Sequence, residues 1–560
     1  MLTAPISAGQ VSFFVAFIWS FFAWIYAEVL HRQKSTRNTH DSDDDPEAAK
    51  LLHANGGGSA AAVAKEGKDS GGGGAGEHAA TGGKPEPVYP PHSFGPHSGI
   101  LESMANSGLV ACLQLKPSAL LQHRHVLRST VEFGLLMLWY FIADRTTIIG
   151  EGPKDYSRDL FLFLFVILTC VAAGSSLQAF KMPLLLNRPQ TEEWKGWMQV
   201  LFLLYHYFEA KEAYSAIRIF IAAYVWMTGF GNFSYYYKTG DFCIGRFAQM
   251  LWRLNFLVFF CCVVLRNSYM LYYICPMHTI YTVFVYVALA VAPQLNQNNI
   301  ALLVKIFLCF VFIFITWDLQ RVFYAIWTPF LWLVGYNDPR KPTEDLLHEW
   351  YFRSSLDRYI WIYGMLCAYM HPWAASVLKA IDEMPAIKRF TVRSVILSAC
   401  GVIGWYYYIH IYCLEKYDYN AIHPYTSWIP ITLWIVVRNI TPTLRIYNLR
   451  LYGWLGCITL ETYISQFHVW MKTDIPDGQP KSLLVLLPGY PLLNFALVTG
   501  LYVLVSHRLF DLTNALKNSA VPHSNNSLLL RNVIMMAVTG AALYGMVAVM
   551  YNLGMGGALT

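Results

Sequence analysis

His206 and Glu209 lie three residues apart in a stretch rich in aromatic residues, so a helix would place the imidazole and the carboxylate on one face. Glu212 would follow near the same stripe. A carboxylate one turn from an imidazole fixes its tautomer and raises its basicity, as a general base acting on a hydroxyl acceptor requires. The alternative is the end of a helix at a membrane interface, where aromatic residues and solvated charges are common.

Glu461, Ser465 and His468 occur at positions i, i+4 and i+7, so one helix face would carry an acid, a hydroxyl and an imidazole. These are the residue types of a nucleophile, a base and an orienting acid. A polar clamp between two membrane helices is an equally good interpretation of the same pattern.

Arg246 and Arg253 are seven residues apart and therefore share one helix face, with Asn255 two positions further on. Fixed cations at such a place could hold the phosphates of a nucleotide-bearing donor. The alternative is that the arginines extend to the membrane surface. This alternative fits Arg246, at the start of the apolar run, better than Arg253, which lies inside the run.

His278 follows Pro276 inside an otherwise apolar run. A proline frees a backbone carbonyl and can kink a membrane helix. His278 could therefore be either a catalytic residue or a structural histidine bonded to the freed carbonyl.

Membrane helices must position all of these side chains. Of the 560 residues, 55% are hydrophobic and 14% are charged, against roughly 25% charged in soluble proteins. Many apolar runs approach or exceed the roughly 18 to 20 residues that cross a bilayer. The clearest are residues 11–30, 160–177, 247–265, 270–292, 300–317, 394–412, 482–505 and 532–551. Shorter runs include 131–143, 322–334, 427–437 and 451–464. We predict an all-α, polytopic integral membrane protein with about 11 to 13 transmembrane helices.

The chain divides into three predicted parts. Residues 1–30 form a membrane anchor helix, and the basic residues that follow it should face the cytosol. Residues 31–129 contain an acidic run and glycine-rich stretches, which predict a low-complexity, largely disordered cytosolic loop with one short helix near 109–121. Residues 130–560 form the multipass domain.

Two kinds of site are not expected. The net charge of +6 is dispersed along the chain, which argues against nucleic-acid binding and for contact with lipid headgroups. The 11 cysteines lack the paired spacing of a zinc site or of a disulfide framework, so we expect no metal.

Long motifs in the same stretches resemble the plant reduced wall acetylation family, which groups with the fungal capsule O-acetylation proteins and the membrane half of animal sialic acid O-acetyltransferases. The resemblance rests on residues 188–199, 205–208, 224–237, 252–256, 267–279, 347–350, 357–361, 423–432 and 460–468. It covers about residues 131 to 516 and fails over the glycine-rich loop.

The resemblance implies an O-acetyltransferase in the Golgi membrane that takes acetyl from cytosolic acetyl-CoA for O-acetylation of cell-wall polysaccharides in the lumen. Relatives carry a luminal hydrolase-like domain with a serine nucleophile, which we do not find in this chain, so a separate luminal polysaccharide O-acetyltransferase could complete the transfer. The rival hypothesis is a transporter of acetyl-CoA or of another acetyl donor.

On the hypothesis of an O-acetyltransferase, each candidate residue has an expected role. Arg246, Arg253 and Asn255 would bind acetyl-CoA, and His206, oriented by Glu209, would be the base or the transient acetyl acceptor. The same cavity would be lined by His278, Glu461 and His468.

Overall fold

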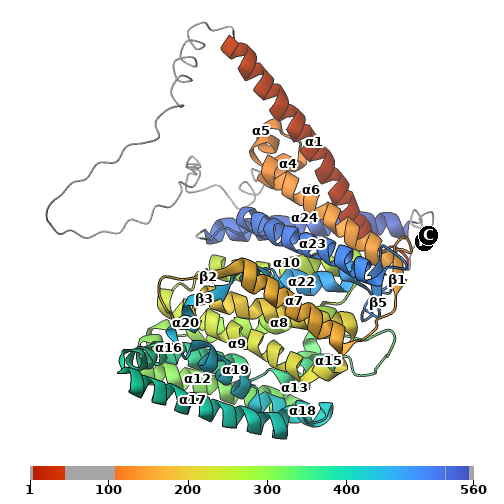
Figure 1. Ribbon diagram of the computed structural model, residues 1–560. Helices are drawn as coiled ribbons and strands as arrows, with labels where there is room; N and C mark the ends of the chain where they lie inside the picture. Colours follow the sequence, from red (N-terminus) through yellow and green to blue (C-terminus); the bar gives the residue numbers. More distant parts are fainter. Residues whose placement is uncertain (1–3, 44–107, 524, 554–560) are drawn as a thin grey trace, which may run out of the picture. The chain divides into compact units, whose positions relative to one another are not determined.

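The computed structural model describes residues 4–43, 108–523 and 525–553, and the fold is almost entirely helical (Figure 1). The chain divides into two compact units, one formed by residues 19–128 and the other by residues 1–18 and 129–560. The glycine-rich part of the predicted loop, at 44–107, lies outside the described residues. The predicted cytosolic loop therefore stays a prediction.

The smaller unit contains most of α1 (Ala8–Asp43), the short helices α4 (Gly108–Leu113) and α5 (Pro117–Gln122), and the start of α6 (Arg124–Arg145). Its core consists of Ala23, Ala27, Cys112, Ala119, Leu120 and Leu127. The short helix predicted near 109–121 is two helices, because Pro117 starts a new one at its first position. Helix α1 also continues past residue 30, the predicted end of the anchor.

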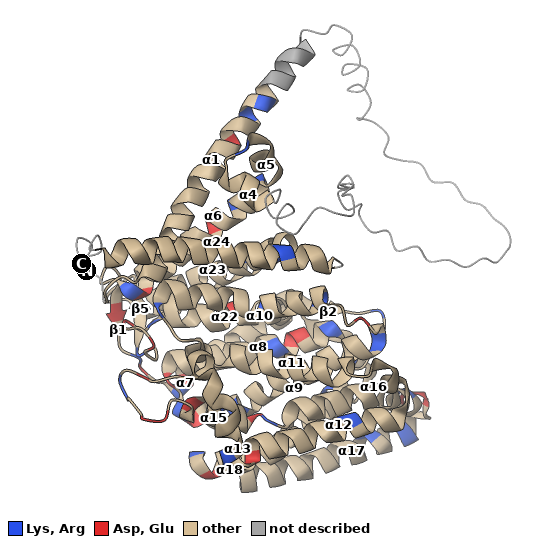
Figure 2. Cartoon of the chain, turned by 180° about the vertical axis from the view of Figure 1, so that it is seen from behind, with Lys and Arg blue, Asp and Glu red and all other residues tan. Residues whose placement is uncertain are grey.

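Within the described residues, nine helices are long and apolar enough to cross a membrane. They are Ala8–Thr36, Arg124–Arg145, Arg158–Ser176, Lys211–Thr239, Ile244–Leu265, Asn299–Asp318, Ala386–Tyr412, Pro491–Ala520 and Asn526–Asn552. A tenth apolar helix, Ile274–Ala290, is shorter. Lys, Arg, Asp and Glu are sparse along the helices (Figure 2). The prediction of an all-α polytopic membrane protein is confirmed.

Nine is fewer than the predicted number of crossings, because several apolar runs form only short helices. The runs at 322–334, 427–437 and 451–464 become α13 (Gln320–Trp327), α19 (Trp428–Asn439) and α21 (Arg450–Cys457) followed by α22 (Thr459–Ser465). By contrast, α8 (Arg188–Phe208) and α16 (Ile360–Glu383) have 21 and 24 residues. At about 1.5 Å per residue they are long enough to cross, but they are less apolar than the nine.

Two small sheets mark opposite ends of the helix bundle in the larger unit (Figure 1). One is antiparallel in the order β1-β5-β4, from β1 (Gly150–Gly152), β5 (Ser482–Val485) and β4 (Met471–Lys472). The other pairs β2 (Leu177–Ala179) with β3 (Tyr447–Leu449). Helix α7 (Arg158–Ser176) connects β1 to β2, and we call the two ends the β1 end and the β2 end.

Chain order gives each helix a direction between these ends. Helix α8 starts after β2, so α8 and α10 (Ile244–Leu265) begin at the β2 end, while α9 (Tyr214–Thr239) and α11 (Ile274–Ala290) begin at the β1 end. Helix α22 leads into β4 at the β1 end, and α23 (Pro491–Ala520) leaves β5 toward the β2 end.

Glycines allow two pairs of helices to touch backbone to backbone. A Cβ on Gly196 of α8 or on Gly456 of α21 would lie 1.9 Å from a backbone oxygen of the facing helix. Gly229 of α9 and Gly364 of α16 meet the opposite backbone in the same way, at 1.9 and 2.3 Å. Small residues at crossing points are the usual means by which membrane helices pack closely. These contacts hold α8 and α9 in the middle of the bundle.

The remaining helices complete the larger unit. They are α12 (Asn299–Ile313), α14 (Leu331–Val334), α15 (His348–Leu356), α17 (Ala386–Tyr407), α18 (Lys416–Thr426), α20 (Pro442–Ile446) and α24 (Asn526–Asn552). Three π-helical turns, Phe314–Asp318, Tyr408–Tyr412 and Gln466–Trp470, interrupt or extend the α-helices. Such turns change the face on which the following side chains emerge.

Candidate functional site

A cavity of about 440 Å³ lies between α8, α9, α10, α11, α22 and α23. Its lining includes four cationic side chains, one histidine and several aromatic and hydroxyl groups. Three residues of the predicted site, Arg246, Arg253 and His278, line this one cavity. The structure therefore brings together cations and an imidazole that are up to 32 positions apart in sequence.

The cations gather toward the β2 end. Arg246 is in the first turn of α10, Lys195 is two turns into α8 and Lys517 is in the last turn of α23. Lys195 pairs with Glu192 at 2.6 Å. Within the described part of the chain no carboxylate lies within ion-pair distance of Arg246 or Lys517, so this part of the cavity carries excess positive charge. Such a place favours a phosphate-bearing ligand.

Arg253 is held in place before any ligand binds. Its guanidinium forms a two-pronged ion pair with the carboxylate of Glu461, with Nη2 2.8 Å from Oε2. It also lies 4.7 Å from the ring centroid of Phe510. Arg246 is similarly placed over Tyr235, at 4.8 Å. Glu461 is fully buried, so it positions Arg253 and neutralises part of its charge.

His278 lies deeper in the cavity and has a defined hydrogen bond. Its Nδ1 is 2.7 Å from the hydroxyl oxygen of Thr228. That hydroxyl also lies 3.3 Å from the backbone oxygen of Tyr224, to which it can donate its proton while it accepts from Nδ1–H. In that arrangement, Nε2 of His278 carries the lone pair. His278 can then act as a base or as a nucleophile.

Asn255, predicted to bind the donor, is engaged with its neighbours instead of the cavity. Its amide donates to the backbone oxygen of Leu251 and to Thr279, both at 3.0 Å, and its carbonyl oxygen accepts from Tyr269. These bonds join α10 to α11 beside His278. The observed contacts of Asn255 are therefore those of a helix-to-helix clamp.

The predicted stripe of His206, Glu209 and Glu212 does not form. Helix α8 ends at Phe208, and Glu209 takes a left-handed conformation with φ of 54°. The helical i, i+3 relation to His206 is lost there, and Glu209 pairs with Lys211 at 3.2 Å at the surface. Glu212 pairs with Arg158. The pairing of His206 with a carboxylate is thus a wrong prediction.

His206 itself lies just behind the cavity. Its ring centroid is 4.6 Å from that of Phe202, which is part of the lining. Its backbone oxygen accepts a hydrogen bond from Lys154 at 3.0 Å, near the β1 end. His206 therefore approaches the cavity from the side opposite to the cations.

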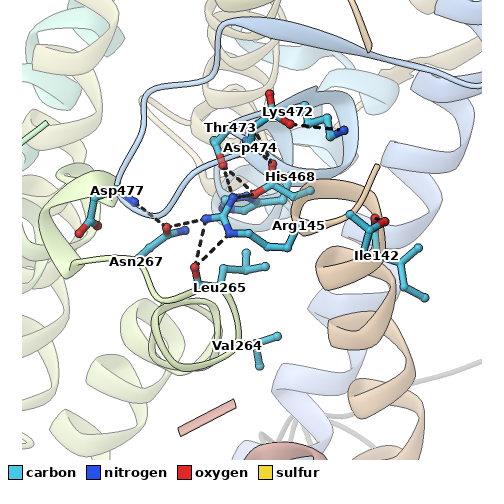
Figure 3. Close-up of polar contacts among 12 residues, drawn as sticks. Ile142, Arg145, Val264, Leu265, Asn267, His468, Lys472, Thr473, Asp474 and Asp477 are labelled. Atoms are coloured by element: carbon cyan, nitrogen blue, oxygen red, sulfur yellow. Dashed lines mark hydrogen bonds and ion pairs between the residues drawn. The ribbon is translucent and has the colours of Figure 1, made fainter. Parts of the chain in front are cut away.

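His468 belongs to a separate buried network at the β1 end. Its Nδ1 is 2.8 Å from the carboxylate of Asp144, and its Nε2 is 2.6 Å from the hydroxyl of Tyr272. Figure 3 shows Arg145 of the same network between Asn267 and the Thr473 segment. Here Arg145 donates to Asn267 at 2.8 Å and to Thr473 at 2.6 Å.

The residues Glu461, Ser465 and His468 therefore diverge to three different partners. Glu461 binds Arg253, Ser465 contacts the hydroxyl of Tyr140, and His468 contacts Asp144. The π-helical turn at Gln466–Trp470 also breaks the regular helical spacing. Of the two interpretations of this motif, these contacts match the clamp between helices.

Three residues of the two sites, Lys195, Lys517 and Asp144, were not singled out by the sequence. Lys195 and Lys517 complete the cationic part of the cavity, and Asp144 and Tyr272 hold His468. Asp144 and Arg145 follow an apolar run, which is a signal of a helix end. Nothing in the spacing of the two lysines indicates that they meet. Among the described residues, no group of three or more His, Cys, Asp or Glu side chains is suited to holding a metal ion.

Comparisons with known proteins relate the chain to a family of membrane acyltransferases. Residues 103–534 match the family described as "10 TM Acyl Transferase domain found in Cas1p". The chain is 33% identical over 422 residues to the N-acetylneuraminate (7)9-O-acetyltransferase of Danio rerio. The similar region covers 71% of this chain and 51% of the relative, so the chain spans about half the length of this curated relative. No solved structure matches the chain.

Proposed function

The chain belongs to the family of the 10 TM acyl transferase domain found in Cas1p, and we propose that it is a membrane-bound O-acetyltransferase with acetyl-CoA as its donor. The family supplies the reaction class. The relative from Danio rerio is an O-acetyltransferase by name, which favours acetyl as the acyl group and a hydroxyl as the acceptor. The cavity between α8, α9, α10, α11, α22 and α23 is the proposed donor site.

One observation carries this assignment: a single cavity holds uncompensated cations at one end and His278 further in. CoA has the matching polarity, with its phosphates at one end and its thioester at the other. Lys195, Arg246, Arg253 and Lys517 would hold the phosphates. The flexible arm of CoA would then extend toward His278.

In the proposed reaction, Nε2 of His278 removes the proton of the acceptor hydroxyl as its oxygen attacks the thioester carbonyl carbon. The C–S bond breaks, CoA leaves as a thiolate, and the proton on His278 passes to that sulfur. Thr228 holds the imidazole in the required tautomer throughout. Products are the acetyl ester and CoA, so the reaction balances without a metal or a redox cofactor.

For the acceptor, we propose a cell-wall polysaccharide hydroxyl in the Golgi lumen, or a separate luminal polysaccharide O-acetyltransferase that receives the acetyl group. The support is the resemblance of the long motifs to the plant acetylation family. The basic β2 end would face the cytosol by the positive-inside rule, where acetyl-CoA is available.

The test uses the full chain in proteoliposomes with acetyl-CoA labelled in both the acetyl and the CoA parts. We expect acetyl transfer in the wild type and a loss of about 10²- to 10⁴-fold in His278→Ala. The matched control is His371→Gln, because His371 lies on α16 outside the cavity lining and its imidazole bonds to the backbone oxygen of Leu185, in the segment before α8. His206→Ala in the same assay tests the histidine behind Phe202.

Three results would change this proposal. Full activity of His278→Ala removes that residue from the mechanism. Entry of both labels into the lumen together indicates a carrier for acetyl-CoA. Labelled acetyl retained on the denatured protein would replace the base mechanism by a covalent acetyl-enzyme.

A further inference from the structure

Tyr463 is part of the cavity wall, and its buried hydroxyl has no hydrogen-bond partner among the described residues. The side chain is 3% exposed and is part of the cavity lining. Among the described residues, no hydrogen-bond acceptor lies within reach of its hydroxyl. Buried hydroxyl groups are normally paired, so an orphan at a cavity wall points to a ligand atom as its partner.

The other hydroxyl groups of the lining already have partners. The hydroxyl of Tyr224 donates to the backbone oxygen of Lys195 at 2.6 Å, and Thr228 contacts His278. Thr282 accepts from Asn232 at 3.3 Å. Among the described tyrosines of the cavity lining, Tyr463 is therefore the one whose hydroxyl remains available to a ligand.

The ring of Tyr463 is fixed by aromatic neighbours on both sides. Its centroid lies 6.0 Å from that of Phe202 and 5.6 Å from that of Phe467, which stands nearly perpendicular at 85°. Helix α22 carries Tyr463 two positions after Glu461, whose ion pair with Arg253 anchors the helix to α10. A hydroxyl on such a support needs little reorganisation to act.

The hydroxyl lies beside the start of the helix that carries His278. Ile274, in the first turn of α11, lines the cavity together with Tyr463 of α22. Ile274 and His278 are one turn apart and both line the cavity.

We propose that Tyr463 is a catalytic residue whose O–H donates a hydrogen bond to the thioester carbonyl oxygen of the donor, an inference that rests on the proposed function. When the acceptor oxygen adds to the carbonyl carbon, the C=O π electrons move to oxygen and form an oxyanion. Tyr463 stabilises this charge and keeps its own proton. The C=O bond then re-forms as the C–S bond breaks, and the thiolate leaves.

The test is Tyr463→Phe, which removes only the hydroxyl. Loss of one oxyanion donor typically lowers kcat by about 10²- to 10³-fold. We expect this fall in kcat, with the KM for acetyl-CoA changed by less than about threefold and the thermal midpoint in detergent unchanged. Stability should hold because the hydroxyl makes no hydrogen bond within the part of the chain that the structure describes.

The matched control is Tyr502→Phe, since the Tyr502 hydroxyl donates to the backbone oxygen of Thr462 on the same helix α22 and does not line the cavity. Its loss should lower stability and leave kcat within about threefold. A kcat of Tyr463→Phe within threefold of wild type overturns the proposal, and so does a change confined to KM or to stability. Absence of acetyl transfer by the wild type, or full activity of His278→Ala, would instead refute the proposed function.

Discussion

Arg253 and Glu461 form an ion pair across α10 and α22, and the carboxylate of that pair is completely buried. The two residues are 208 positions apart in the chain. The pair links the cationic part of the cavity to the helix that carries Tyr463. One contact thus fixes both a predicted donor-binding residue and the proposed oxyanion donor.

Removal of the acid should destabilise the protein. In Glu461→Gln, Arg253 keeps its charge in a largely buried place without a counterion, which typically costs about 3 kcal/mol. We expect a clearly lower free energy of unfolding in detergent, measured by chemical denaturation. The control is Glu383→Gln, whose pair with Lys379 is exposed and contributes at most about 0.5 kcal/mol. Equal stability of the two variants would show that the buried pair contributes little.

His468 should matter for stability and not for donor binding. His468→Ala leaves Asp144 and Tyr272 without one partner each inside a fully buried network, at a cost of about 2 kcal/mol or more. The affinity for acetyl-CoA, measured by calorimetry, should stay within about threefold of wild type because His468 does not line the cavity. The exposed His348→Ala provides the control for stability. A tenfold weaker affinity would place His468 in the donor site.

The glycine contacts between α9 and α16 should tolerate no added methyl group. In Gly229→Ala the new Cβ would lie 1.9 Å from the backbone oxygen of Trp361, so the two helices must separate. We expect a loss of about 3 kcal/mol and a lower thermal midpoint. Gly500→Ala, on a helix face with open space, should cause no loss. A stable Gly229→Ala would mean that the helices are packed less closely than the structure has them.

Sequence patterns predicted the membrane helices and part of the site, because both depend on local spacing. The seven-residue interval between Arg246 and Arg253 indicates one helix face, and the structure places both in the cavity with His278. Arg253 and Glu461 belong to distant helices, so only the fold reveals their pairing. Glu209 shows where local spacing misleads. Its predicted contact with His206 required α8 to continue past Phe208, but the helix ends there.

Tyr463 shows why the remainder of the site could not be found in the sequence. In an aromatic stretch a tyrosine hydroxyl is one of many, and the role proposed for Tyr463 rests on its hydroxyl having no partner among the described residues. Hydrogen-bond satisfaction is a property of the packed structure. The two lysines of the cavity, from α8 and α23, depend in the same way on tertiary arrangement.

Lys154 should make stability depend on pH above neutrality. It lies between β1 and α7, and its ammonium donates to the backbone oxygens of His206 and Pro480 at 3.0 and 2.9 Å. Burial lowers the pKa of Lys154 from 10.5 to about 8, an effect that the charge of Glu209 partly offsets. The unfolded chain therefore binds more protons than the folded one between about pH 8 and 10.5, and stability should rise with pH across that window.

The measurement is the free energy of unfolding in detergent at pH 7.5, 9 and 10.5, for the wild type and for Lys154→Met. Since other groups titrate in the same window, only the difference between the two proteins reports on Lys154. The free energy of unfolding of the wild type, relative to that of the variant, should increase by up to about 3 kcal/mol as the pH rises. Each pKa unit corresponds to about 1.4 kcal/mol. A constant difference would mean that the two backbone oxygens stabilise the ammonium enough to cancel the effect of burial. In that case, Lys154 would hold the end of α8 beside His206 equally well throughout this pH range.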